Sequence, residues 1–128
     1  MTYYIARTIN ASFEQTIKRV IEALKAEGFG VLTDIDVQAT MKAKLGKNFR
    51  AYRILGACNP TLAHEALLLE DKVGTMLPCN VVVQDAGEGN TEIAAIDPVA
   101  SMQAIDNPAL LKSAELVRVK LMKAVEAA

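Results

Sequence analysis

Apolar and polar positions at the start of the chain alternate first with the period of a strand and then with that of a helix. Residues 3–9 keep apolar side chains on one side of an extended segment, although Arg7 interrupts that side near its end. Ser12 follows with the spacing of a helix N-cap, and apolar residues recur at helical spacing through residues 12–27 until Gly28. This pattern predicts a half-buried strand followed by an amphipathic helix.

The same two periods return in the middle of the chain. Residues 29–35 predict a second strand, and residues 37–45 predict a short helix because apolar side chains recur there at every fourth position. A third strand over residues 49–57 then leads into a helix over residues 60–69. Gly56, near the end of that strand, indicates a bulge or a close approach of the backbone to another group.

Two strands and two helices are predicted in the last third of the chain. A fourth strand covers residues 79–83, and residues 85–90 have the composition of a hairpin loop. Because this loop is too short for a crossover, the strand over residues 91–96 should run antiparallel to the fourth. A short helix then starts at Asp97-Pro98, and the terminal helix starts at Asn107-Pro108.

Three predicted helices begin with a capping residue followed by proline. The pairs are Asn59-Pro60, Asp97-Pro98 and Asn107-Pro108. The Asn or Asp oxygen accepts a hydrogen bond from a free N–H group of the first turn, and the fixed φ of proline suits the first helical position. These pairs are therefore interpreted as helix boundaries.

The element order predicts an α+β fold. We expect one domain, residues 1–128, built as a two-layer sandwich in which helices cover one face of a mixed or mainly antiparallel sheet. A strand, a helix and two strands occur twice in order, so residues 52–96 echo residues 3–52 as a duplicated β-α-β-β unit.

The central strands have apolar side chains on both faces, whereas one layer of helices covers only one face. One expected set, or its alternates, faces the helices: Ile54, Val81, Val83, Ile93 and Ala95. The other set points away: Leu55, Val82, Ala94 and Ile96. We expect a second copy of the chain to cover this second face, so the chain should be a homodimer through its sheet. The alternative is that the terminal helix crosses to that face. Arg118 lies within the apolar arc of this helix, where it extends its stem over the core edge or pairs across a subunit contact.

Composition narrows the classes of function. The chain has 128 residues, of which 52% are hydrophobic and 23% charged, with a net charge of −1, so neither disorder nor electrostatic nucleic-acid binding is indicated. Basic residues cluster only at Lys42, Lys44, Lys47 and Arg50, which we interpret as a solvated helix face. We expect no nucleic-acid partner.

Neither a membrane segment nor a signal peptide is indicated. The chain contains no apolar stretch of about 18 residues, and its first residues lack the charged start and apolar centre of a secretion signal. We therefore expect a cytoplasmic protein without a membrane partner. In that reducing compartment, Cys58 and Cys79 should be free thiols.

Two clusters of residues are candidates for binding. The first is Cys58, Asn59 and His64, at the start of a helix whose dipole lowers a thiol pKa and attracts a small anion. A structural role for Cys58 as a small buried hydrophobe and for His64 as a surface residue is the alternative.

The second cluster is Cys79, Asn80 and Asp97, which should lie together if the fourth and fifth strands pair antiparallel. Asn80 there is interpreted as satisfying backbone groups at a loop entrance. With a parallel fourth strand, Cys58 and Cys79 would lie roughly 20 Å apart, which argues against a disulfide or a shared metal. We accordingly expect no metal and no cofactor.

Several short segments resemble a known family. Arg53-Ile54-Leu55-Gly56-Ala57-Cys58-Asn59-Pro60 and Leu77-Pro78-Cys79-Asn80-Val81-Val82-Val83 are similar to the signature blocks of domain of unknown function 302, an uncharacterised bacterial and archaeal family. The likeness extends to Lys44-Leu45-Gly46 and Ile96-Asp97-Pro98. It implies a small α+β domain with a duplicated β-α-β-β unit, and it implies no activity or cofactor.

These observations favour a non-enzymatic homodimeric domain that binds a ligand or a partner. The alternative is a thiol-based redox or soft-metal module that uses Cys58 with His64. An enzyme that acts on a small anion near Asn59 has the least support, so the sequence leaves open whether the protein is an enzyme.

Overall fold

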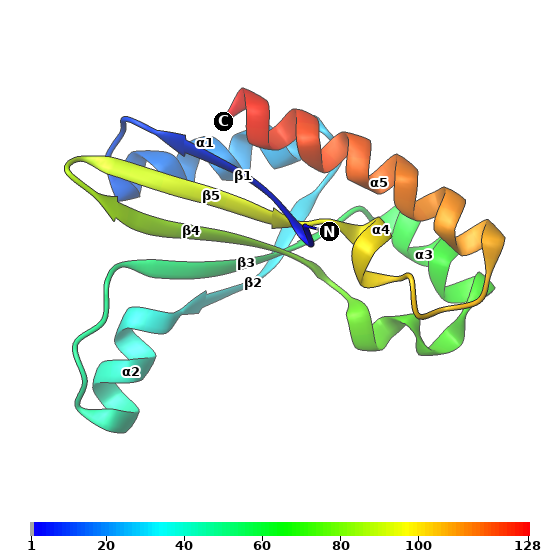
Figure 1. Ribbon diagram of the computed structural model, residues 1–128, viewed down its shortest axis with the longest axis horizontal. Helices are drawn as coiled ribbons and strands as arrows, with labels where there is room; N and C mark the ends of the chain where they lie inside the picture. The colour runs from blue at the N-terminus through cyan, green and yellow to red at the C-terminus, as the bar shows by residue number, and fades with distance from the viewer. Residues whose placement is uncertain (1) are drawn as a thin grey trace.

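The structure, a computed structural model, describes residues 2–128. Its first half contains β1 (Tyr4–Ile9), α1 (Phe13–Ala26), β2 (Gly30–Asp36), α2 (Val37–Leu45) and β3 (Tyr52–Cys58). Its second half contains α3 (Pro60–Leu69), the 3-10 helix η1 (Asp71–Met76), β4 (Cys79–Gly87), β5 (Asn90–Ile96), α4 (Pro98–Ser101) and α5 (Pro108–Ala127). All the strands and helices expected from the sequence pattern are present (Figure 1).

The strands form a five-stranded sheet in the order β1-β5-β4-β3-β2, and each neighbouring pair is antiparallel. This arrangement confirms the expected α+β sandwich with a mainly antiparallel sheet. The expectation of a fourth strand parallel to the third is wrong. Figure 1 shows the reason: α3 lies beyond the strand ends instead of crossing the sheet, so the chain returns beside the strand that it left.

The two expected β-α-β-β units occupy different places in the sheet. Helix α1 connects β1 to β2, which are the two edge strands, whereas α3 connects β3 to β4, which are neighbours. With five strands, the order of elements repeats along the chain only if β3 is counted in both units, and the strand arrangement does not repeat in space.

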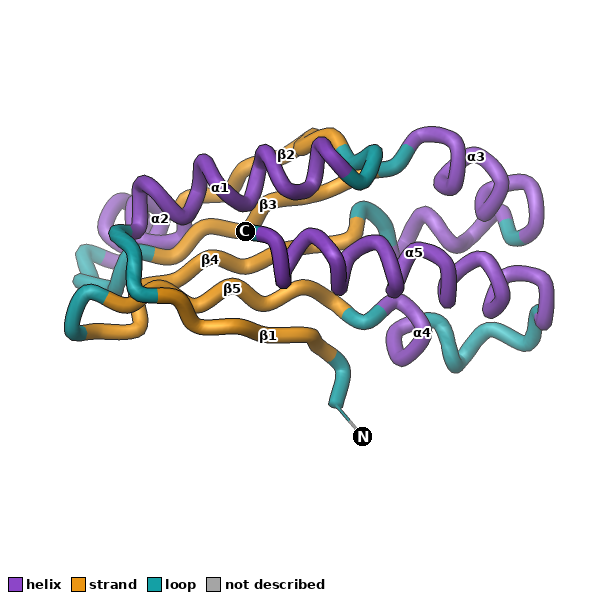
Figure 2. Tube along the Cα trace, turned by 90° about the horizontal axis from the view of Figure 1, so that it is seen from above, coloured by secondary structure: helices purple, strands orange, loops and turns teal. Residues whose placement is uncertain are grey.

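Helices α1 and α5 pack against each other on one face of the sheet (Figure 2). Helix α1 contacts β2, β4 and β5, and α5 contacts β1 and β5. The alternative in which the terminal helix crosses to the far face is therefore wrong. The short helix α2 lies on the other side of the sheet, where it contacts β3 (Figures 1 and 2).

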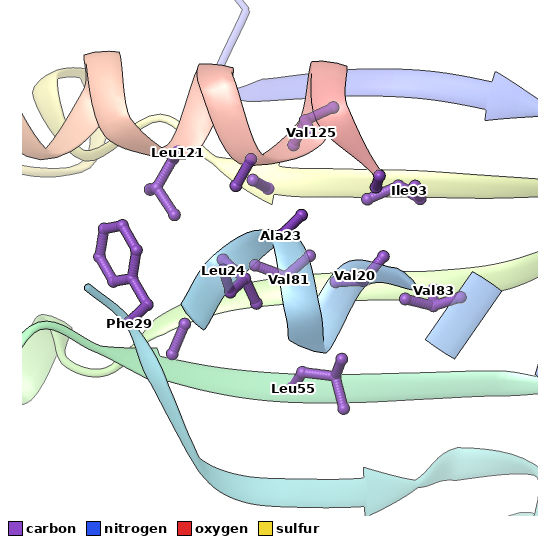
Figure 3. Close-up of a cluster of buried hydrophobic side chains, with 14 of the residues drawn as sticks. Val20, Ala23, Leu24, Phe29, Leu55, Val81, Val83, Ile93, Leu121 and Val125 are labelled. Carbon is purple, nitrogen blue, oxygen red and sulfur yellow. The ribbon is translucent and has the colours of Figure 1, made fainter. Parts of the chain in front are cut away.

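The main core fills the space between these two helices and the sheet (Figure 3). Its buried side chains include Val20, Ala23, Leu24, Leu55, Val81, Val83, Ile93, Leu121 and Val125. Leu55 and Ile54 face the reverse of the sides expected for them. Because Leu55 is paired with Val81, Leu55 is fully buried under the helices and Ile54 lies on the open face.

Each of the three Asn-Pro or Asp-Pro helix starts is a genuine cap. Asn59 Oδ1 accepts a hydrogen bond from Leu62 N–H at 3.2 Å, Asp97 Oδ1 from Val99 N–H at 3.0 Å, and Asn107 Oδ1 from Leu110 N–H at 3.2 Å. Each proline follows at the start of the helix, where its missing N–H group costs nothing.

Arg7, which interrupts the apolar pattern of β1, binds the end of α5. Its guanidinium donates hydrogen bonds to the main-chain oxygens of Val125 and Ala128, each at 3.2 Å, and of Glu126. The last carbonyl groups of a helix lack partners within the helix and carry a partial negative charge, so a cation stabilises them. Arg7 thus fastens the terminal helix to an edge strand.

Arg118 forms its ion pair within its own chain. Its Nε donates to Asp97 Oδ2 at 3.0 Å, which links the middle of α5 to the residue that caps α4. The ion pair of Arg118 therefore lies within one chain and involves no second subunit.

Gly56 marks the closest approach of backbone and side chains in the sheet. A Cβ atom at this position would lie 2.1 Å from Thr33 Oγ1 and 2.7 Å from Pro78 Cγ. Gly30, on the neighbouring strand, has no atom within 4 Å of the corresponding position. Of these two strand glycines, Gly56 is therefore the one that packing requires.

We predict that Gly56→Val lowers the free energy of unfolding by about 1–3 kcal/mol, because the added side chain forces Thr33 or Pro78 to move. The matched control Gly30→Val should change it by less than about 0.5 kcal/mol. Urea unfolding followed by circular dichroism measures both. An unchanged midpoint for Gly56→Val would show that the strand junction is not tightly packed.

Candidate functional site

A small cavity lies where β3 and β4 meet α3, α4 and α5. It has a volume of about 50 Å³, and its wall is almost entirely apolar. The residues that line it are Phe29, Ala57, Cys58, Asn59, Leu62, Ala63, Ala66, Leu77, Pro78, Cys79, Pro98, Met102, Leu110, Ser113, Ala114 and Val117. No side chain among them is charged or is a histidine.

Both cysteines line this one cavity. Ala57 is paired with Cys79 across β3 and β4, so Cys58 is the next residue along the chain from the partner of Cys79. Antiparallel partners have Cα atoms about 5 Å apart, so the separation of roughly 20 Å expected from a parallel fourth strand is wrong. Both thiols are free, as expected.

Asn59 joins Cys58 at this cavity, and His64 does not. Asn59 lines the wall while its side-chain oxygen caps α3. His64 is exposed, whereas Ala63 and Ala66 of the same helix face the cavity. The helical period therefore turns His64 away, and the first candidate cluster keeps Cys58 and Asn59 only.

The second candidate cluster is divided between different surfaces. Successive residues of a strand point to opposite faces, so Cys79 faces the cavity while Asn80 is exposed and lines a hollow on the open face of the sheet. Asp97 caps α4 and pairs with Arg118. Its carboxylate therefore has a structural role.

Burial sets the chemistry of Cys79. Its side chain is 7% exposed, and loss of water, followed by the nearby Cys58 thiol, raises the pKa of Cys79 to about 11. Cys58 is only half-buried. The two thiols of one cavity thus differ in their access to solvent.

No sequence pattern predicts which residues form the wall of the cavity opposite the two cysteines. Met102 directly follows α4, and Leu110 and Ser113 belong to α5, about 20 to 50 residues away from the cysteines along the chain. Their pattern is that of ordinary helix residues. Only the docking of α5 against α3 brings them to the cysteines.

The hollow on the open face of the sheet is larger, with a volume of about 350 Å³. It is lined by Tyr3, Tyr4, Tyr52, Asn80, Val82, Gln84, Glu92, Ala94, Ala95 and Ile96. Its mixed polar and aromatic lining resembles a protein contact surface more than an enclosed ligand site.

Neither a multidentate metal cluster nor a membrane helix is found in residues 2–128. No three His, Cys, Asp or Glu side chains of that part of the chain converge as metal ligands. None of its helices has the length and apolar character to cross a bilayer.

Two comparisons with known proteins find matches. The model of the family Domain of unknown function DUF302 matches residues 5–128. A crystal structure of an uncharacterized conserved protein DUF302 from Bacillus stearothermophilus is 30% identical, with a TM-score of 0.92 over 99% of this chain and 98% of that one. No curated protein matches the sequence.

We predict that iodoacetamide at pH 8 modifies Cys58 and spares Cys79 in the folded chain. With a pKa of about 11, roughly one thousandth of Cys79 is thiolate at that pH, and burial limits access further. Mass spectrometry of the two peptides gives the rates, and chain unfolded in urea, in which both should react, is the control. Equal rates in the folded chain would contradict the buried position of Cys79.

Proposed function

Since the chain belongs to the family Domain of unknown function DUF302, whose description assigns no activity, we propose a function from its own geometry: a homodimeric binding domain that associates through the open face of its sheet. The observation that carries this proposal is an apolar row on the face opposite α1 and α5. The row crosses all five strands through the paired residues Ile35, Ile54, Val82, Ala94 and Ala6.

Exposure along this row supports a partner surface. Ile54, Val82 and Ala94 are half-buried within the monomer, and Ile35 at the edge is 49% exposed. Each Å² of apolar surface removed from water contributes about 25 cal/mol, so an apolar row of this width favours association. A second copy across a two-fold axis covers the same surface on both chains.

Helix α2 supports the same proposal. It stands on the open side of the sheet (Figure 1), it has nine residues, and none of them is buried. Helices this short are marginal in water without packing, and Leu45 near its end is 64% exposed. Contact with a second subunit would supply the missing packing.

Basic and acidic residues occupy separate segments of the chain, and this separation favours a face-to-face dimer. Residues 37–53 contain five basic and no acidic residues, while the hairpin between β4 and β5 carries Asp85, Glu88 and Glu92. Both segments lie at the same end of the sheet (Figure 1). A two-fold axis along the strands would place α2 of one copy beside the acidic hairpin of the other, where opposite charges set the orientation.

The basic segment is held in place by contacts within its own chain. The Arg50 guanidinium lies 4.5 Å from the centre of the Phe49 ring, and its Nε donates to Gln84 Oε1 at 2.8 Å. Arg53 Nε donates to Asp34 Oδ1 at 2.8 Å on β2. Lys42, Lys44 and Lys47 therefore remain as the charges available to a partner.

A small anion at the start of α3 has weaker support as a ligand, because the cavity there carries no cationic side chain. For the location of the protein we propose the cytoplasm, where two free thiols remain reduced.

We expect the native chain to sediment as a dimer at micromolar concentration and Val82→Lys as a folded monomer, because the ammonium group would be buried without a partner at the centre of the interface. Val119→Lys is the matched control, since Val119 is 46% exposed on the outer side of α5 and should leave the dimer intact. Analytical ultracentrifugation of the native chain and the two variants measures whether each is a monomer or a dimer. A native monomer, or a dimer unchanged by Val82→Lys, would exclude this interface.

The proposed contact between α2 of one subunit and the β4–β5 hairpin of the other is tested separately. The double variant Lys42→Glu with Lys44→Glu, and separately Glu88→Lys with Glu92→Lys, should each weaken dimerisation by about tenfold, because each brings like charges together. An equal mixture of the two variants should regain native affinity as a heterodimer. If the native chain is a dimer and neither double variant weakens it, the sheet contact stands and the charged contact is wrong.

A further inference from the structure

We propose that β1 pairs with β1 of a second copy of the chain, so that two sheets join edge to edge into one continuous sheet. This contact goes beyond the proposed dimer, because it uses the main chain at the rim of the sheet and not the open face. β1 (Tyr4–Ile9) is an edge strand whose one neighbour is β5. Figure 2 shows no helix beyond its outer side, so another strand has access to it.

The hydrogen bonds between β1 and β5 fix which main-chain groups of β1 point outward. The Tyr3 carbonyl oxygen accepts a hydrogen bond from Asp97 N–H at 2.8 Å, and the register continues from there along β1 without a bulge. In an antiparallel pair, residues that exchange hydrogen bonds alternate with residues that do not. No hydrogen bond found within residues 2–128 occupies the main-chain groups of the alternate set. These outward residues of β1 are Tyr4, Ala6 and Thr8.

The two edges of the sheet differ in their protection against pairing with another strand. β2, at the other edge, has a register shift between Val31 and Thr33 and exposes Asp34 and Asp36. Bulges and charged side chains are devices that keep edge strands from pairing. β1 contains neither a bulge nor a proline, and its one charged residue, Arg7, is bound to the end of α5. Of the two edges, β1 is therefore the one open to another strand.

The sequence of β1 is compatible with a second β1 that runs in the opposite direction. A two-fold axis perpendicular to the sheet at Ala6 places Ala6 opposite Ala6 of the second copy, and Tyr4 opposite its Thr8. Each facing pair then exchanges two main-chain hydrogen bonds. An aromatic residue opposite a β-branched residue is a favourable cross-strand pair, and Arg7 lies opposite Ile5, so like charges do not face each other. β1 therefore pairs with itself in one symmetric register.

The same register continues the apolar row of the open face into the second copy. Ala6 is the member of that row on β1, and it is paired with Ala94, which in turn is paired with Val82. With Ala6 at the axis, the row of one copy runs directly into the row of the other. Because the axis is perpendicular to the sheet, both open faces lie on the same side. Edge pairing thus lengthens the apolar row and leaves it free for the open-face contact.

The edge contact is small. A pair of six-residue strands buries less than the roughly 1,200 Å² at the lower limit of a stable interface. It therefore forms only at high protein concentration, where chains that also use the open-face contact assemble beyond a dimer. Since the two contacts use different surfaces, the failure of one in an experiment does not imply the failure of the other.

Amide hydrogen exchange, followed residue by residue by NMR, tests the edge contact in the variant Val82→Lys, which lacks the open-face contact. Between about 20 μM and about 1 mM protein, protection of the amides of the outward residues should rise by about tenfold, because pairing occupies their N–H groups by mass action. The amides of Ile5 and Arg7, which bond to β5, should be protected at both concentrations.

Two substitutions at Ala6, each combined with Val82→Lys, isolate the outward N–H group. Ala6→Pro removes this group and keeps the hydrogen bonds to β5, which is why proline is tolerated in edge strands. Ala6→Val is the matched control, since it keeps the N–H group and favours a strand. Sedimentation at about 1 mM should find a dimer for Ala6→Val and a monomer for Ala6→Pro.

Circular dichroism of each variant checks that it is folded, and Thr8→Pro replaces Ala6→Pro if the latter is not. The proposal is overturned if the amides of the outward residues exchange equally at both concentrations. It is also overturned if the folded proline variant forms dimers like Ala6→Val, because the association then does not use the outward N–H groups of β1.

Discussion

The antiparallel pairing of β3 with β4 is the constraint on which the other features of this protein depend. Its register places Leu55 beside Val81 in the core and Ile54 beside Val82 on the opposite face. The same register brings the end of β3 to the start of β4, which closes one side of the cavity. A shift by one residue would exchange the two faces and bury the wrong side chains, so burial itself maintains this register.

The two faces of the sheet differ in burial because both long helices pack on the same face. Arg7 binds the last turn of α5 and thereby holds that helix over β1 and β5, next to α1. The apolar row on the other face is left without cover by any long helix of the chain. An asymmetric sheet of this kind combines a folded core with a surface that favours association.

The cavity belongs to a separate part of the molecule. It lies beyond the strand ends, where α3, α4 and the first half of α5 form a second, smaller cluster of buried residues around Val73 and Leu110. Three helix caps position these elements, and the ion pair of Arg118 with Asp97 links two of them. The two cysteines thus line a cavity at the junction of the sheet and this helical cluster, away from the open face of the sheet.

The sequence by itself determined the secondary structure, the helix caps and the class of fold. Periodicity, proline positions and capping side chains act over a few residues, so they can be read without knowing what lies across the fold. Only the tertiary structure decided the direction of β4, the side of the sheet that α5 covers, and the placement of Cys58 and Cys79 along one cavity. Those outcomes depend on contacts between residues far apart in the chain. A helix between two strands has the same local pattern whether it crosses the sheet or turns back beside the strand that it left.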